Sequence, residues 1–158
     1  MPGDSTPAAV DECPWLTLAL SEVGTKEAPG PADNPLVVAY FRDAGRPEVH
    51  DDEVAWCAAA VGSWLKRTGH QLPPPAKALM ARTYMTYGVA CPPKRGAIGV
   101  WPRGTGWQGH VGLVVSVDGR GSVRVVGGNQ GNAVSVVTMP IATALAFRWP
   151  VSVHVEAS

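Results

Sequence analysis

One cysteine stands at the front of a stretch whose small side chains let a neighbouring layer approach the backbone closely. Residues 52–65 read Asp-Glu-Val-Ala-Trp-Cys-Ala-Ala-Ala-Val-Gly-Ser-Trp-Leu, and the pattern predicts an apolar helix with Cys57 near its start. A helix N-terminus carries unpaired N–H groups and the positive end of the dipole. A thiol placed there loses its proton more readily, and the thiolate is a nucleophile. A reactive cysteine and a buried structural cysteine both fit this pattern.

The composition is that of a folded globular chain. Of its 158 residues, 46% are hydrophobic and 16% are charged, which differs from disordered sequences and suits one domain. The formal net charge is zero, so there is no general electrostatic reason to expect a nucleic acid or an anionic membrane as partner. No apolar run is long enough to span a bilayer, and we expect no membrane insertion.

The three cysteines do not indicate a disulfide scaffold. An odd number cannot pair completely, and Cys13, Cys57 and Cys91 are far apart in the chain. The sequence also has no Cys-x-x-Cys motif and no cluster of His and Cys residues. We therefore expect no structural metal site.

Helical patterns occupy the first half of the chain. Asn34 followed by Pro35 is typical of an N-cap with proline at the first helical position. The cysteine helix is expected to end near Gly69, and the prolines at 73–75 should break the chain direction. Besides the cysteine helix, we expect helices over residues 14–24, 35–44 and 76–87.

Strand patterns dominate the second half. Alternating apolar residues separated by turn signals such as Asp118-Gly119 predict a series of hairpins. The expected strands are residues 97–101, 110–118, 122–126, 133–138 and 145–149. Helices followed by hairpins predict the α+β class, with N-terminal helices packed on a C-terminal antiparallel sheet of about four to six strands.

A histidine and an amide could complete a site around Cys57. His110 begins a predicted strand, where a rigid sheet would hold its imidazole as a general base, although an exposed strand-capping histidine fits too. If the flanking strands form a hairpin, Asn129 or Gln130 lies near His110 and can accept its N–H. Asn129 also fits a purely structural role in the turn over residues 127–132. Cys, His and a polar residue in this arrangement are typical of acyl transfer.

Four segments together resemble the papain-like cell-wall hydrolases of the NlpC-like and CHAP type. CHAP denotes a cysteine, histidine-dependent amidohydrolase/peptidase. The segments are Trp-Cys-Ala-Ala at 56–59, Gly-Ala-Ile-Gly-Val-Trp at 96–101, Gly-His-Val-Gly-Leu-Val at 109–114 and Gly-Gly-Asn-Gln at 127–130. The resemblance implies a single papain-like catalytic domain over residues 12–150, with a flexible lead-in at 1–11 and a tail at 151–158.

The resemblance also implies an activity and roles for individual residues. The activity is cysteine-dependent hydrolysis of amide bonds in bacterial peptidoglycan, by an endopeptidase or an amidase, through an acyl-thioester. By match to the family motifs, Cys57 would be the nucleophile, His110 the base and Asn129 the third catalytic residue, with Gln130 open for the third role. The chemistry requires no metal or other cofactor.

Aromatic and acidic residues near these motifs suggest further roles. Trp56 and Trp107 could line a substrate cleft with Gln130, although core packing also explains tryptophans. The acidic residues 51–53 suit the first turn of a helix. Some CHAP members bind calcium near the nucleophile, so calcium is the one cofactor that the resemblance leaves open, although the spacing here matches no known calcium loop.

Two other functions stay open at this point. One is a non-catalytic cell-wall-binding or phage-tail structural module on the same fold, and the other is a thiol acyltransferase acting on another substrate. The first residues show no secretory signal, so we expect synthesis in the cytoplasm. A phage lysin, a tail-associated hydrolase or an antibacterial effector would then reach the bacterial cell wall, in the periplasm or outside the cell, by lysis, injection or secretion. A phage tail, a secretion-system carrier or an immunity protein would be the corresponding partner.

Overall fold

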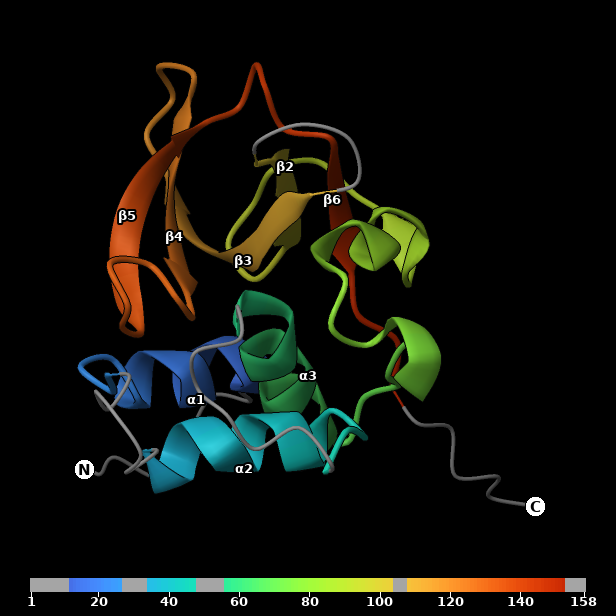
Figure 1. Ribbon diagram of the computed structural model, residues 1–158. Coiled ribbons are helices and arrows are strands. Elements are labelled where there is room, and N and C mark those ends of the chain that lie inside the picture. The colour runs from blue at the N-terminus through green and yellow to red at the C-terminus, as the bar shows by residue number, and fades with distance from the viewer. Residues whose placement is uncertain (1–11, 27–33, 48–55, 104–107, 153–158) are drawn as a thin grey trace, which may run out of the picture.

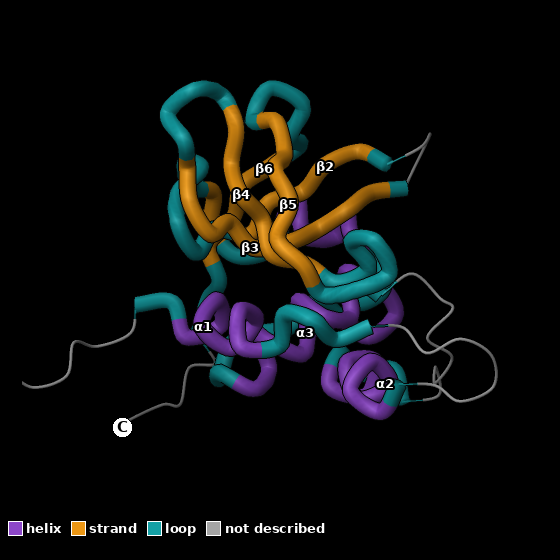
Figure 2. Tube along the Cα trace, turned by 90° about the vertical axis from the view of Figure 1, so that its left-hand side faces the viewer, coloured by secondary structure: helices purple, strands orange, loops and turns teal. Residues whose placement is uncertain are grey.

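The computed structural model describes residues 12–26, 34–47, 56–103 and 108–152. A layer of helices lies against one side of an antiparallel sheet, as Figure 1 shows. The helices are α1 (Pro14–Ser21), α2 (Pro35–Asp43) and α3 (Cys57–Arg67), followed by the short 3₁₀ helices η1 (Pro75–Lys77) and η2 (Ala81–Thr86). Both α1 and α3 contact the sheet, whereas α2 packs on α3 (Figure 2). The expected α+β arrangement is confirmed, and none of these helices is long and apolar enough to cross a membrane.

The sheet contains six strands in the described part of the chain, all antiparallel. Their order is β1–β6–β2–β3–β4–β5, which agrees with the expected four to six strands. The bounds are β1 (Val89–Ala90), β2 (Ile98–Pro102), β3 (Gly109–Val117), β4 (Ser122–Gly127), β5 (Ser135–Pro140) and β6 (Ala146–Trp149). The sequence did not predict β1, because two residues carry no readable alternation.

The helical segment expected over residues 76–87 is present in part, as two short 3₁₀ helices in place of one continuous helix. The chain forms η1 and η2 there, and Ala81 and Tyr84 are the buried residues of η2. A 3₁₀ helix repeats every three residues, so it turns both of these side chains to the same side. This segment packs on β2, β3 and β6, and tertiary burial therefore selects the tighter helix. The N-cap at Asn34 is confirmed, since its side chain accepts a hydrogen bond of 2.8 Å from the Leu36 N–H.

Helix α3 is buried along most of its length. Its first nine residues, Cys57 to Leu65, are all buried. A Cβ atom on Gly62 would lie 3.1 Å from Cβ of Ala44, which shows how closely the chain after α2 approaches. On the sheet side, a Cβ atom on Gly128 would lie 2.7 Å from the Trp56 ring. Small residues in both layers thus let the start of α3 sit directly against the end of β4.

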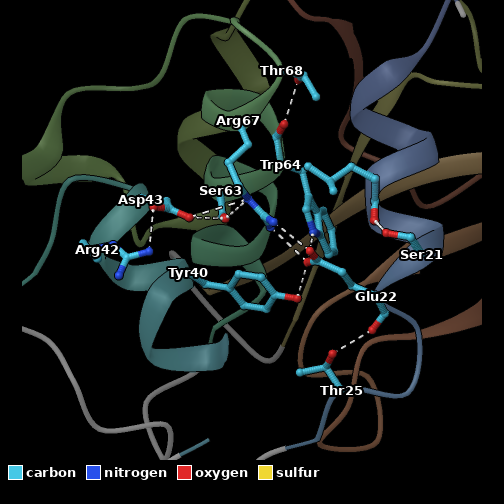
Figure 3. Close-up of polar contacts among 11 residues, drawn as sticks. Ser21, Glu22, Thr25, Tyr40, Arg42, Asp43, Ser63, Trp64, Arg67 and Thr68 are labelled. Atoms are coloured by element: carbon cyan, nitrogen blue, oxygen red, sulfur yellow. Dashed lines mark hydrogen bonds and ion pairs between the residues drawn. The ribbon is translucent and has the colours of Figure 1, made fainter. Parts of the chain in front are cut away.

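A carboxylate at the end of α1 joins the three helices (Figure 3). Glu22 accepts hydrogen bonds from the Tyr40 hydroxyl of α2 at 2.7 Å and the Trp64 indole of α3 at 2.8 Å. It also forms a two-pronged ion pair with Arg67, at 2.7 and 2.9 Å. Burial raises the pKa of the Glu22 carboxyl, but the hydrogen bonds from Arg67, Trp64 and Tyr40 outweigh it and hold this pKa below 4.5.

We expect the substitution Glu22→Gln to lower the free energy of unfolding by about 2 to 4 kcal/mol at pH 7, because it places an amide against Arg67 and weakens three contacts. The depressed pKa contributes stability above about pH 4.5, the ordinary value for this carboxyl, and this contribution is lost as the pH falls through the folded-state pKa. The difference between wild type and variant should therefore shrink below pH 4.5. Urea unfolding at several pH values measures it, with the exposed Glu12→Gln as control; equal losses in the two variants would contradict the role of Glu22.

Candidate active site

The thiol of Cys57 lies at the N-terminus of α3, where the sequence placed it. The N-cap is Trp56, without a side-chain cap, and the acidic residues 51–53 lie outside the described residues. Cys57 is 4% exposed, and burial raises the pKa of its thiol. Hydrogen bonding by the backbone of Val111, the charge of Arg103 and the backbone N–H groups of Ala58 and Cys57 act in the opposite direction but do not outweigh burial. The expected lowering of the pKa is thus wrong, because burial of the thiol raises it and favours the neutral form.

His110 lies on the strand that contacts this thiol. It is the second residue of β3, is 7% exposed and pairs across the ladder with Trp101 of β2. The next residue along the strand is Val111, whose backbone hydrogen-bonds the Cys57 sulfur. The structure therefore brings Cys57 and the His110 segment together, although they are far apart in the sequence.

Gln130 determines which nitrogen of the His110 ring carries the proton. The Gln130 amide nitrogen donates to the carbonyls of Ser135 at 2.7 Å and Val125 at 3.3 Å, so its oxygen faces His110. That oxygen, Oε1, lies 2.7 Å from His110 Nε2 and can only accept. The proton is therefore on Nε2, and Nδ1 is the basic nitrogen. Nδ1 is buried and has no hydrogen-bond partner among the described residues.

Two motif glycines leave the space that the Gln130 side chain fills. A Cβ atom on Gly127 would lie 2.6 Å from Gln130 Oε1. A Cβ atom on Gly112 would lie 3.6 Å from the same oxygen and 2.5 Å from Val125 Cγ1. Any side chain at Gly127 would therefore displace the amide from His110. The glycines of Gly-His-Val-Gly and Gly-Gly-Asn-Gln thus carried a signal that Gln130 is the amide that contacts His110, since its side chain reaches over them.

Asn129 occupies a different position. Its backbone has φ of 60°, a left-handed conformation that asparagine tolerates, and its side chain is half-buried. The hydrogen bond that the sequence allowed for either amide comes from Gln130, and none links Asn129 to His110 among the described residues. Asn129 instead lines a cavity beside the histidine.

The turn that carries Gln130 is fixed by backbone contacts. The Gln130 N–H donates to the Ala133 carbonyl at 2.9 Å, and the Ser135 hydroxyl donates to the Gln130 carbonyl at 2.9 Å. Val134, which follows Ala133 in this turn, is tied to the chain just after α1. Its carbonyl accepts a hydrogen bond of 2.9 Å from the Gly24 N–H, and its N–H donates to the Thr25 carbonyl at 2.7 Å. The end of α1 therefore supports the residue that orients His110.

A cavity of about 290 Å³ opens beside His110. One part of its lining is polar, and Val137 and Met139 of β5 give it an apolar wall. The full lining consists of Pro102, Arg103, His110, Asn129, Gln130, Gly131, Val137 and Met139. Its size suits a small group of a larger substrate.

Of the two tryptophans expected to line a substrate cleft, the structure describes only Trp56. Trp56 is completely buried and stacks on Tyr40, with ring centroids 5.9 Å apart and planes inclined by 25°. The expectation that Trp56 binds substrate is therefore corrected to a core position under the site. Trp107 lies outside the described residues. Among the residues that the structure covers, no three His, Cys, Asp or Glu side chains form a group able to hold a metal ion.

A comparison with known protein families shows to which family the chain belongs. The model of the CHAP domain family matches residues 49–129, a little over half of the sequence. The chain belongs to the CHAP family. The match includes Cys57, His110 and Asn129 and ends one residue before Gln130. CHAP domains are in general cysteine- and histidine-dependent hydrolases, and membership implies a peptidoglycan hydrolase or an amidase or peptidase. No curated protein and no solved structure matches the chain.

We expect the His110 imidazole in this CHAP domain to titrate below its ordinary pKa of 6.5. Burial lowers the pKa, the hydrogen bond to Gln130 raises it, and the charge of Arg103 lowers it further. His110 would therefore stay neutral, and able to accept a proton, at pH 6.5. An NMR titration of the ring signals, assigned by their loss in His110→Gln, measures this value, and a midpoint above 6.5 would contradict the assignment.

Proposed function

We propose that the protein is a cysteine-dependent amide hydrolase, an endopeptidase or amidase, that cleaves bacterial peptidoglycan through an acyl-thioester. The observation that carries the proposal is the state of the His110 ring. Its Nε2–H is bound to Gln130, and its Nδ1 is left as a buried acceptor without a partner. A buried unpaired acceptor is costly, so it indicates a functional group. The thiol bound to the backbone of the adjacent Val111 is the proton donor that we assign to it.

The first half of the reaction uses these groups in turn. Cys57 transfers its proton to His110 Nδ1 as its sulfur attacks the carbonyl carbon of the amide. The negative charge that develops on the carbonyl oxygen would be stabilised by the backbone N–H of Cys57 at the start of α3, together with a second donor. Loss of one such donor typically costs about 2.7 to 4 kcal/mol in the barrier. His110 then protonates the leaving amine, and the acyl group remains on the sulfur.

The second half restores the enzyme. Neutral His110 accepts a proton from water, which attacks the thioester carbonyl, and the sulfur leaves as a thiolate that recovers the proton from His110. Gln130 keeps Nδ1 directed to the reaction throughout. Because an amide is neutral, Gln130 orients the ring and does not supply a counter-charge to the imidazolium.

The direct test is cleavage of purified sacculi by wild type and by Cys57→Ala. We expect wild type to release fragments and Cys57→Ala to release none, because the nucleophile is gone. Mass spectrometry of the fragments identifies the bond, and circular dichroism checks the fold. Cys91→Ala, at a half-buried cysteine outside the site, is the matched control and should keep full activity.

Full activity of Cys57→Ala would refute the proposal. A folded wild type that binds sacculi and releases nothing, with and without added calcium, would favour a non-catalytic cell-wall or phage-tail module. Transfer of the acyl group to an added amine in place of water would favour a thiol acyltransferase. We further propose that the protein acts at the cell wall as a phage lysin, tail hydrolase or delivered antibacterial effector, which lysis of cells on periplasmic but not cytoplasmic expression would support.

Substitutions at the two neighbouring amides separate their roles. We expect Gln130→Ala to lower kcat by roughly 100-fold, because the His110 ring loses the contact that orients it. Asn129→Gly should keep activity within a few-fold, since glycine accepts a φ of 60° without strain. Steady-state rates on a soluble wall peptide measure both, with thermal melting as the folding check. The opposite ranking would assign the third catalytic role to Asn129.

A further inference from the structure

A positive charge lines the cavity beside His110 without an anionic partner among the described residues. Arg103 follows β2 directly, and it is exposed and lines the cavity. None of the eight lining residues is acidic, and Arg103 forms no ion pair or side-chain hydrogen bond among the described residues. Arg67, by contrast, already has partners: it forms ion pairs with Glu22 and Asp43 and a hydrogen bond with Ser63. Arg103 is thus available to a ligand.

The backbone at Arg103 is held in place by the framework of the sheet. Its N–H donates to the Gln108 carbonyl at 3.3 Å, across the ends of β2 and β3. The same carbonyl accepts a hydrogen bond of 2.7 Å from the Arg82 side chain of η2. The Arg103 side chain therefore extends from a fixed backbone position at the edge of the cavity, and ligand binding has to order only the side chain.

Arg103 also lies near the reacting groups. Its charge lowers the pKa of both the Cys57 thiol and the His110 imidazole. An anion bound to Arg103 would therefore sit close to the amide bond that these two residues attack. The cavity offers such an anion a neutral apolar wall, Val137 and Met139, and the amide of Asn129.

We propose that Arg103 and the wall of Val137 and Met139 form a subsite for an acidic residue of the peptidoglycan stem peptide, bound through its free carboxylate and aliphatic stem. A guanidinium can bind both oxygens of a carboxylate in a planar fork, whereas a carboxamide offers one acceptor and two unmatched donors. The subsite should therefore discriminate against stem peptides in which this carboxylate is amidated. The inference rests on the proposed hydrolase function.

The test compares two synthetic stem peptides that differ only in a free carboxylate or a carboxamide. Their affinities for the Cys57→Ala protein are measured by calorimetry, so that no cleavage interferes. We expect the carboxylate peptide to bind roughly 10- to 100-fold more tightly. Arg103→Gln in the same background should remove this preference. Arg120→Gln, at an exposed arginine in the β3–β4 turn, should leave it unchanged.

Each outcome separates the subsite from the hydrolase function. Equal affinity for the two peptides, absence of binding by either, or a preference that survives Arg103→Gln overturns the subsite. Cleavage of both peptides by wild type at equal kcat/KM would also overturn it while leaving the hydrolase intact. A carboxylate preference that depends on Arg103, without cleavage by wild type, would support the subsite and refute the hydrolase.

Discussion

Close packing between the start of α3 and the end of β4 is the constraint on which the site depends. The Trp56 ring lies where a side chain on Gly128 would have to be, so the helix and the strand end are in direct contact. This contact brings the thiol of Cys57 to the backbone of Val111. The same turn continues into Gln130, which reaches back over Gly127 to His110. This packing contact therefore fixes the positions of α3, the end of β4 and the turn that carries Gln130 relative to one another.

The helical layer supports this arrangement from the far side. Glu22 joins α1 to α2 and α3 through Tyr40, Trp64 and Arg67 (Figure 3). Two and three residues further along, Gly24 and Thr25 exchange backbone hydrogen bonds with Val134, next to the turn of Gln130. A single ion pair near the surface contributes little to stability, but a partly buried carboxylate with four donors fixes geometry as well. The polar network thus links the helices to the orientation of the imidazole.

Burial gives the site its chemical character. It raises the pKa of the Cys57 thiol and lowers that of the His110 imidazole, so both groups rest in their neutral forms. A neutral pair suits proton transfer during attack, whereas a preformed thiolate–imidazolium pair would need charges to be stabilised before substrate arrives. Arg103 is the charged group at the edge of this apolar environment, and its field acts on both partners. The proposed carboxylate subsite and the proposed attack by Cys57 would therefore lie close together.

The sequence by itself determined the α+β class, the helix start at Cys57, the cap at Asn34 and the hairpin through Asp118-Gly119, because these depend on local patterns of apolar residues and turn formers. It also placed His110 at the start of its strand. Only the tertiary structure showed that Gln130, and not Asn129, contacts His110, and that Trp56 lies in the core. It also determined that 3₁₀ helices form within residues 75–86 and that burial raises the pKa of the Cys57 thiol. Each of these depends on atoms distant in the chain: the space over two glycines, the Trp56 ring against Gly128, the packing of η2 on β2, β3 and β6, and desolvation that outweighs the helix dipole.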